Sequence, residues 1–286
     1  MILSTIGPSL TDFTCILSSS FETVSQMTTS VALGYCIGAL ISGLAFQYFN
    51  RQLIVIIFVS IASIVIICMP FTPSLTLLLV FGLISSFGNG TIDAAQNTWF
   101  IEMWQEHSNS VLQLAQFMFG LGTIITPIIE GPYLTGETNA TDSNSNNSFV
   151  TPHDRRMLLA KPYALIGAIQ LSSVLLLALM FCYKKYEPPE VQNEQVEKKL
   201  FEDAPKSLRI SIILLISLCL GCHLSVETSH FAYIVSFAQY IPLKMTPNNA
   251  ALLQGLTAAS YTVMRAAGAL IALWLSPRQM MLINYK

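Results

Sequence analysis

The sequence predicts an all-α protein that crosses a lipid bilayer several times. Of its 286 residues, 53% are hydrophobic and only 10% are charged, which is far from the composition of an average soluble domain. Apolar runs recur along the chain, and a helix of about 20 such residues spans the hydrocarbon layer. The charged residues collect between these runs. We therefore expect a polytopic membrane protein with about seven complete spans and a partial span at each end.

The first residues predict the end of a membrane helix rather than a secretory signal. Residues 1–20 lack a basic start, and Gly7, Pro8 and Asp12 interrupt their short apolar part. The complete spans that follow are predicted at 24–49, 53–69, 75–104, 110–129, 163–183, from Leu208 onward, and at 250–275. A further apolar segment begins after Arg278.

Small residues recur at every fourth position of the 24–49 span. Ser30, Gly34, Gly38 and Ser42 fall on one face of a helix with 3.6 residues per turn. Such a face lets a neighbouring helix approach closely. We therefore expect this span to pack tightly against another.

Two hydrophilic segments divide the chain. Residues 131–161 form a polar loop with glycosylation acceptor sequences at Asn139 and Asn146, which favours the extracellular side. Residues 184–207 form a charged linker, and most Lys and Arg residues lie on its side of the spans, which favours the cytosol. We expect an N-terminal six-helix bundle at 1–183 and a second, incomplete bundle at 208–286, in the plasma membrane.

The span at 75–104 carries a carboxylate at membrane depth. Asp93 lies well inside the apolar run, where an acid costs about 2.5 to 3.5 kcal/mol and usually faces protein or water. Its helix face also carries Asn89, Gln96, Asn97 and Phe100. This stripe predicts a polar path, although a purely structural role for Asp93, bonded to a serine or a backbone amide, is the alternative.

The two spans after the linker carry further polar residues. His223, Glu227 and His230 share one helix face, and Arg265 on the next span is the natural countercharge for Glu227. His donors beside a Glu suit a polyhydroxylated ligand, a metal ion or a buried hydrogen-bond network. The alternative for Arg265 is a side chain that reaches the cytosolic surface.

Other classes of function have little support in the sequence. Cys219, Cys222 and His223 have the spacing for covalent haem attachment, but they lie within a span without a second axial ligand. No residue pattern indicates an enzyme. A net charge of −2 without a basic patch gives no support for nucleic-acid binding. The six cysteines lie in or beside apolar runs and are expected to be unbridged thiols.

Several short motifs in the sequence resemble those of a known family. Gly88 to Asn97 reads GNGTIDAAQN. This stretch is similar to the fourth-helix motif Gly-x-Gly-x-x-Glu-x-Ala-x-Asn of the fucose permease group, within the major facilitator superfamily. The loop motif Gly-x-x-x-Asp-x-x-Gly-Arg keeps Gly43 and Arg51, although Gln47 replaces its acid and Asn50 its second glycine. Leu114-Ala115-Gln116 and Arg265-Ala-Ala-Gly268 match further motifs, and Phe119 replaces a polar Asn. Within the group, the chain looks most like the animal sodium-dependent glucose transporter subfamily.

The resemblance implies a major facilitator fold and a role for each motif residue. Asp93 would take the place of the proton-coupling acid, with Asp12 as the first-helix acid. Asn97, Gln116 and Glu227 would hydrogen-bond the sugar and Arg265 would hold the Glu227 charge. With His223, these residues are the expected substrate-binding set. The family plan has twelve spans, so a missing helix start and four missing spans are expected. A half-built second bundle is expected not to transport.

We therefore predict a secondary transporter that moves a hexose-like sugar across the bilayer with Na⁺ or H⁺, without another cofactor. Carboxylates without a fixed partner suit either cation, since Na⁺ prefers oxygen ligands and a proton needs an acid. The alternatives are a non-transporting, truncated protein that binds or regulates a partner, and a metal or redox membrane protein built on Cys219, Cys222 and His223.

Overall fold

The computed structural model of the chain describes residues 2–105, 108–136, 151–184, 186, 205–242 and 244–272, and all its regular elements there are helices. The α-helices are α1 (Ile2–Leu17), α2 (Phe21–Ala45), α3 (Arg51–Cys68), α4 (Leu75–Trp104), α5 (Ser108–Glu130), α6 (Pro152–Tyr183), α8 (Lys206–Tyr240) and α9 (Pro247–Ala272). The short 3₁₀ helices η1 (Met69–Phe71) and η3 (Gly131–Tyr133) follow α3 and α5.

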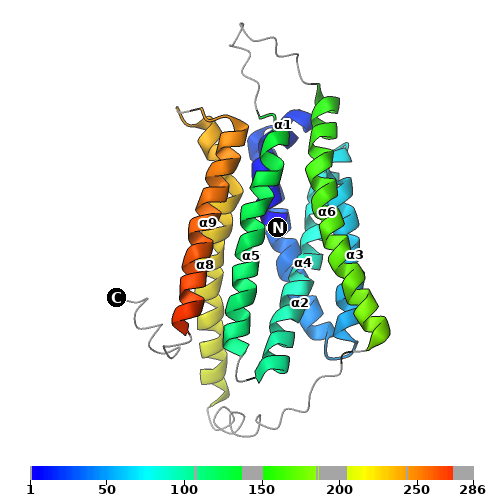
Figure 1. The fold of residues 1–286 in the computed structure, drawn as a ribbon, viewed down its shortest axis with the longest axis vertical. Helices are drawn as coiled ribbons and strands as arrows, with labels where there is room; N and C mark the ends of the chain where they lie inside the picture. The colour runs from blue at the N-terminus through cyan, green and yellow to red at the C-terminus, as the bar shows by residue number, and fades with distance from the viewer. Residues whose placement is uncertain are drawn as a thin grey trace.

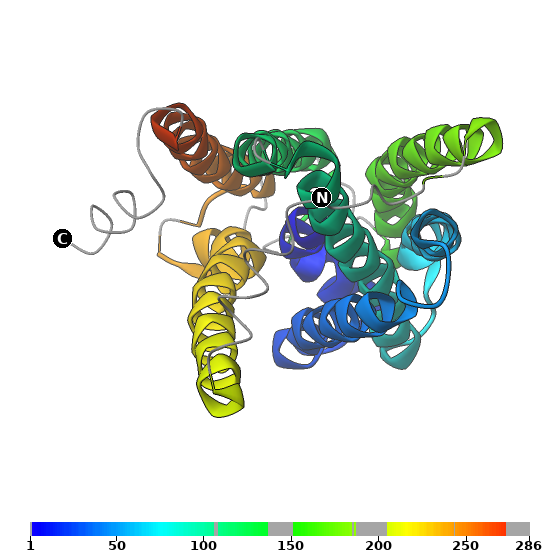
Figure 2. The same ribbon diagram turned by 90° about the horizontal axis from the view of Figure 1, so that it is seen from below.

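The helices run roughly parallel and form two groups, a first group of α1 to α6 and a second group of α8 and α9. Figure 1 shows α8 and α9 at one end, α2, α3, α4 and α6 at the other, and α1 and α5 between them. Figure 2, seen from below, gives the same order. The contacts between the two groups run mainly through α5 with α9 and α1 with α8.

Six of the described helices are long and apolar enough to cross a membrane, namely α2, α3, α4, α5, α6 and α8. This number is smaller than the predicted seven because α9 is not among the six. α9 has 26 residues, but Gln254, Tyr261 and Arg265 reduce its apolar character. It therefore falls short on composition rather than on length.

Helix α2 packs against α4 along the predicted small-residue face. A Cβ atom on Gly34 would collide with the Leu83 backbone, and one on Gly38 would collide with the Phe87 backbone. The Ser30 hydroxyl donates to the Leu79 carbonyl at 2.6 Å, across the same seam. The prediction of a close helix approach is confirmed, because only small residues let the two backbones come this near.

Helix α6 begins well before the predicted start near Tyr163. Thr151 caps its N-terminus, Pro152 occupies the first turn, and Asp154 completes a capping box with Thr151. The prediction that residues 131–161 form one polar loop was therefore wrong at 152–161, which are helical. Because the first turns of α6 are charged, they were assigned to the polar loop despite the capping residues at their start.

The buried core lies among α1, α2, α4 and α6. Leu10, Phe13, Met27, Leu78 and Tyr163 are each at most 1% exposed. By contrast, large apolar side chains are exposed on the outside of the bundle, including much of α8. This distribution is what a bilayer-embedded bundle requires, because lipid covers the outer apolar face.

Candidate functional site

A polar network joins α5, α8 and α9 between the two groups of helices. The Arg265 guanidinium donates to the Gln116 Oε1 at 3.0 Å, to the Glu227 Oε1 at 3.3 Å and to the Tyr261 hydroxyl at 2.7 Å. The Tyr261 hydroxyl donates to the second Glu227 oxygen at 2.8 Å. We call these four residues the α5–α8–α9 network. Arg265 is its centre, with partners on all three helices.

The helices place these side chains by local spacing and close packing. Tyr261 and Arg265 lie four residues apart on α9, so their side chains share one face, and the guanidinium stacks 4.3 Å from the Tyr261 ring centre. Gly120 of α5 lies directly against the Thr262 side chain. This contact brings α5 close enough to α9 for Gln116 to reach Arg265.

The network balances charge and remains partly exposed. Arg265 and Glu227 form an ion pair in which 19% and 16% of the side chains remain exposed. The predicted pairing of these two residues is confirmed, so Arg265 points into the bundle contact. A guanidinium, an amide and a carboxylate together offer both donors and acceptors.

Two residues that were predicted near this site do not join the network. His223 lies one turn before Glu227 on α8, is exposed, and forms no hydrogen bond with a described residue. Asn97 is half-buried on α4 and likewise has no hydrogen-bond partner among the described residues. Their role in ligand binding stays a prediction.

Asp93 has one polar partner on the neighbouring helix. The Tyr35 hydroxyl of α2 donates to the Asp93 carboxylate at 2.5 Å. Asp93 is half-buried and forms no ion pair with a described residue. Asn89, on the same stripe, donates its amide to the Ser85 carbonyl at 2.9 Å. Asp93 therefore sits inside the bundle with a hydroxyl donor rather than a countercharge.

Asp12 lies in a different environment, in the second half of α1 and beside the segment that follows η3. Its carboxylate pairs with Arg155 of α6 at 3.1 Å, and both side chains are at most 5% exposed. It also accepts hydrogen bonds from the Thr135 hydroxyl and from the Gly136 backbone. No described contact joins it to Asp93. The predicted role of Asp12 in ion coupling stays a prediction, and its observed partners tie α1 to α6 and to the segment after η3.

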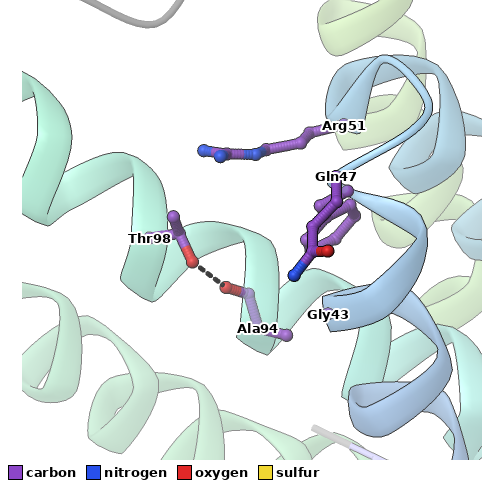
Figure 3. A pocket seen from close by; sticks show the side chains of 6 residues that line it. Gly43, Gln47, Arg51, Ala94 and Thr98 are labelled. Carbon is purple, nitrogen blue, oxygen red and sulfur yellow. Dashed lines mark hydrogen bonds between the residues drawn. The ribbon is translucent and has the colours of Figure 1, made fainter.

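The loop-motif residues line a cavity of about 220 Å³ between the end of α2 and α4. Gly43 and Arg51 form part of its wall, and Figure 3 shows the Arg51 side chain extending toward the α4 side. Arg51 pairs with Glu102 of α4 at 2.6 Å. The Tyr186 hydroxyl donates to the other Glu102 oxygen at 2.8 Å. Partial burial, together with the Glu102 carboxylate, raises the pKa of Tyr186 to about 12.

The remaining predicted groups do not form a metal or redox site in the described part of the chain. No three His, Cys, Asp or Glu side chains come together there as metal ligands. Cys219 and Cys222 are exposed on α8, and the six cysteines form no disulfide with one another. Asn139 and Asn146 lie outside the described residues.

Sequence reasoning missed the two donors that face the predicted acids. Tyr35 follows Gly34 of the small-residue face. A tyrosine inside a span usually needs a partner for its hydroxyl, so the sequence could have indicated a contact with a polar residue of the neighbouring helix. Arg155 was assigned to a loop, and only the capping box at Thr151 places it on a helix beside α1. Tyr261 lies four residues before Arg265, a spacing that could have indicated their contact.

Comparisons with known proteins cover nearly the whole chain. A sequence model of the Major Facilitator Superfamily matches residues 1–285. The human sodium-dependent glucose transporter 1 is 22% identical over 98% of the chain and 55% of its own length. Major facilitator superfamily domain-containing protein 4A of Xenopus tropicalis is 25% identical over 59% of the chain and 36% of its own length.

The zebrafish (Danio rerio) sodium-dependent glucose transporter 1 is 27% identical over 64% of the chain and 33% of its own length. The chain thus spans about half the length of the human relative, at 55%, and less of the other two. The family match extends over every described helix. The chain belongs to the major facilitator superfamily of membrane transporters.

Proposed function

We propose that the protein is a secondary transporter that moves a hexose-like sugar across the plasma membrane together with Na⁺ or H⁺. The observation that carries the proposal is the α5–α8–α9 network. Gln116 belongs to the first group of helices, whereas Glu227, Tyr261 and Arg265 belong to the second. A transporter of this superfamily works by moving one bundle against the other around a site between them.

A sugar hydroxyl matches the bonds that hold this network. Each hydroxyl both donates and accepts, so it can replace the bond between Arg265 and Gln116 and also bond to Glu227. The exchange would leave the Arg265–Glu227 ion pair in place. Solute binding would then alter the polar link between the two groups of helices without leaving a buried charge unpaired.

Asp93 supplies the group for the coupling cation. It lies on α4 without an ion-pair partner among the described residues, and its only described hydrogen bond comes from Tyr35. A carboxylate in this state can ligate Na⁺ or take up a proton, since neither requires displacement of a fixed countercharge. The two relatives named as sodium-dependent glucose transporters support a sugar and Na⁺ as the first pair to test.

Sidedness follows from the positions of basic residues and acceptor sequences. We place the 184–207 linker in the cytosol and the segment with Asn139 and Asn146 outside. Removal of N-glycans should lower the apparent mass of the protein, and the double variant Asn139→Gln with Asn146→Gln should migrate at that mass without treatment. A glycan-free protein at the cell surface would contradict this placement.

Radiolabelled hexose uptake tests the function directly. The protein at its full transcript length should raise uptake over control cells, with a dependence on Na⁺ or on external pH. Gln116→Ala should lower uptake about tenfold, equivalent to about 1.4 kcal/mol of binding. Gln26→Ala, at an exposed position of α2, is the matched control and should behave as wild type. Normal surface expression without uptake in any condition would instead favour a non-transporting membrane protein.

A further inference from the structure

A buried acid at the end of α5 takes no part in the features described above. Glu130 is 0% exposed, and its two carboxylate oxygens form no hydrogen bond of normal geometry with a described residue, although the Thr5 hydroxyl lies beside them. No cationic side chain of the described residues forms an ion pair with it. An isolated ionised carboxylate in a protein interior carries a large desolvation cost. The observed surroundings therefore suit the neutral acid.

Polar groups of α1 and α6 lie beside Glu130. Thr5, Ser9 and Asp12 fall on one face of α1, at intervals of four and three residues, and each is at most 2% exposed. The Ser9 hydroxyl is hydrogen-bonded to the Tyr163 hydroxyl at 2.7 Å. The groups in electrostatic contact with Glu130 include Thr5 and Tyr163. The acid thus lies at one end of a buried polar row that reaches Asp12.

Both ends of this row adjoin the contact between the two groups of helices. Asp12 pairs with Arg155 and holds the Thr135–Gly136 segment. Directly after Glu130, Gly131 packs against the Asn248 side chain of α9, and Gly136 packs against Pro247. Movement of α9 away from η3 would therefore open the region next to Glu130 to water.

We propose that Glu130 is a proton-binding site, which holds a proton while η3 packs against α9 and releases it to water when this contact opens. The step transfers one proton from the carboxyl group to a water molecule and leaves a hydrated carboxylate. Among the described residues, the titratable group that interacts with Glu130 is Tyr163 on α6. Farther along the row, Asp12 on α1 is paired with Arg155 on α6. The proposal adds a second acid to Asp93, and its role in the cycle rests on the proposed transport function.

Infrared spectroscopy of the protein in lipid nanodiscs tests the protonation without any transport. At neutral pH, the wild type should show the C=O band of a protonated carboxylic acid, and ¹³C-labelled glutamate should shift that band. Glu130→Gln should lose the band, whereas Glu22→Gln, at an exposed position of α2, should keep it. The proposal would be overturned if the wild type showed no C=O band that shifts with the label. It would also be overturned if the band persisted in folded Glu130→Gln.

One further measurement separates this proposal from the proposed function. In uptake assays, Glu130→Gln should lose the dependence on external pH while hexose exchange continues, and an unchanged pH profile would remove Glu130 from the cycle. If wild type exchanges no hexose, the proposed function fails, while the infrared result still decides the Glu130 site.

Discussion

The Tyr35 hydroxyl of α2 donates a hydrogen bond of 2.5 Å to the Asp93 carboxylate of α4. The two residues come from helices whose backbones touch along a seam of glycine and serine. A hydroxyl donor stabilises the carboxylate less than an Arg or Lys partner would. The acid therefore stays available for a cation.

Replacement of Asp93 by Asn should separate transport from accumulation. Asn keeps the size of the side chain and can still accept from Tyr35, but it can neither take a proton nor offer a charged ligand. We expect hexose exchange to remain within about threefold of wild type and concentrative uptake to disappear. Counterflow and accumulation assays on the same vesicles measure the two properties. Accumulation at the wild-type level would remove Asp93 from coupling.

Replacement of Tyr35 by Phe should lower stability modestly. The change removes one donor and leaves the half-buried Asp93 without a hydrogen bond, which costs about 1 kcal/mol in a membrane bundle. Thermal unfolding in detergent measures this loss. Tyr48→Phe is the matched control, because Tyr48 is 81% exposed. Equal stability of the two variants would mean that the Asp93 contact contributes little.

Arg265 and Glu227 should show strong coupling in a double-mutant cycle. Arg265→Met leaves the Glu227 charge without its cation, and such a loss at a largely buried pair costs about 3 to 5 kcal/mol. Glu227→Gln combined with Arg265→Met removes both charges and should restore part of the folded yield. The size-exclusion profile and the unfolding temperature of Arg265→Met, of Glu227→Gln and of the double variant give the coupling. If the stability losses of Arg265→Met and Glu227→Gln simply added up in the double variant, the ion pair would not contribute to folding.

The α2–α4 seam predicts opposite effects for two glycines of the same helix. Gly38→Ala places a Cβ against the Phe87 backbone and should destabilise the protein, because helix backbones cannot yield locally. Gly43→Ala has no atom within 4 Å to collide with, and it should gain up to about 1 kcal/mol from helix propensity. Unfolding temperatures of both variants test this difference. If Gly43→Ala lowered the unfolding temperature and Gly38→Ala did not, the close contact between α2 and α4 would not lie at Gly38.

Tyr186 should titrate at unusually high pH. Burial and the Glu102 carboxylate raise its pKa to about 12, so the neutral phenol contributes stability that is fully present below the unfolded-state pKa near 10 and is lost as the pH rises toward 12. NMR of protein with ¹³C-labelled tyrosine should show one resonance that shifts late and is absent in Tyr186→Phe. Glu102→Gln should bring its midpoint down. An ordinary midpoint in the wild type would exclude the Tyr186–Glu102 contact.

The close helix contact and the Arg265–Glu227 ion pair could both be predicted from the sequence. The fourfold repeat of small residues at Gly34 and Gly38 predicts a close helix contact because no larger residue fits there. Arg265 predicted its pairing with Glu227 because a lone charge at that depth is costly.

Pairings between distant segments could not be predicted in this way. Asp12 meets Arg155 because α6 extends beyond its apolar part, and the segment after η3 also lies against this pair. Glu130 gives no sign in the sequence of being fully enclosed, since it stands at the boundary between an apolar run and a polar segment. Such burial depends on how α1, α5 and α6 converge.

The glycine seam between α2 and α4 has a mechanical consequence. Two helices whose backbones touch cannot slide past each other without a steric collision, so they travel as a single lever. Tyr35 and Asp93 ride on this lever together, and their distance stays constant throughout a rocking motion. In the proposed transport cycle, such a motion would change how far the pair is open to the surrounding water. Solvent access to Asp93 would then determine when a cation enters and leaves.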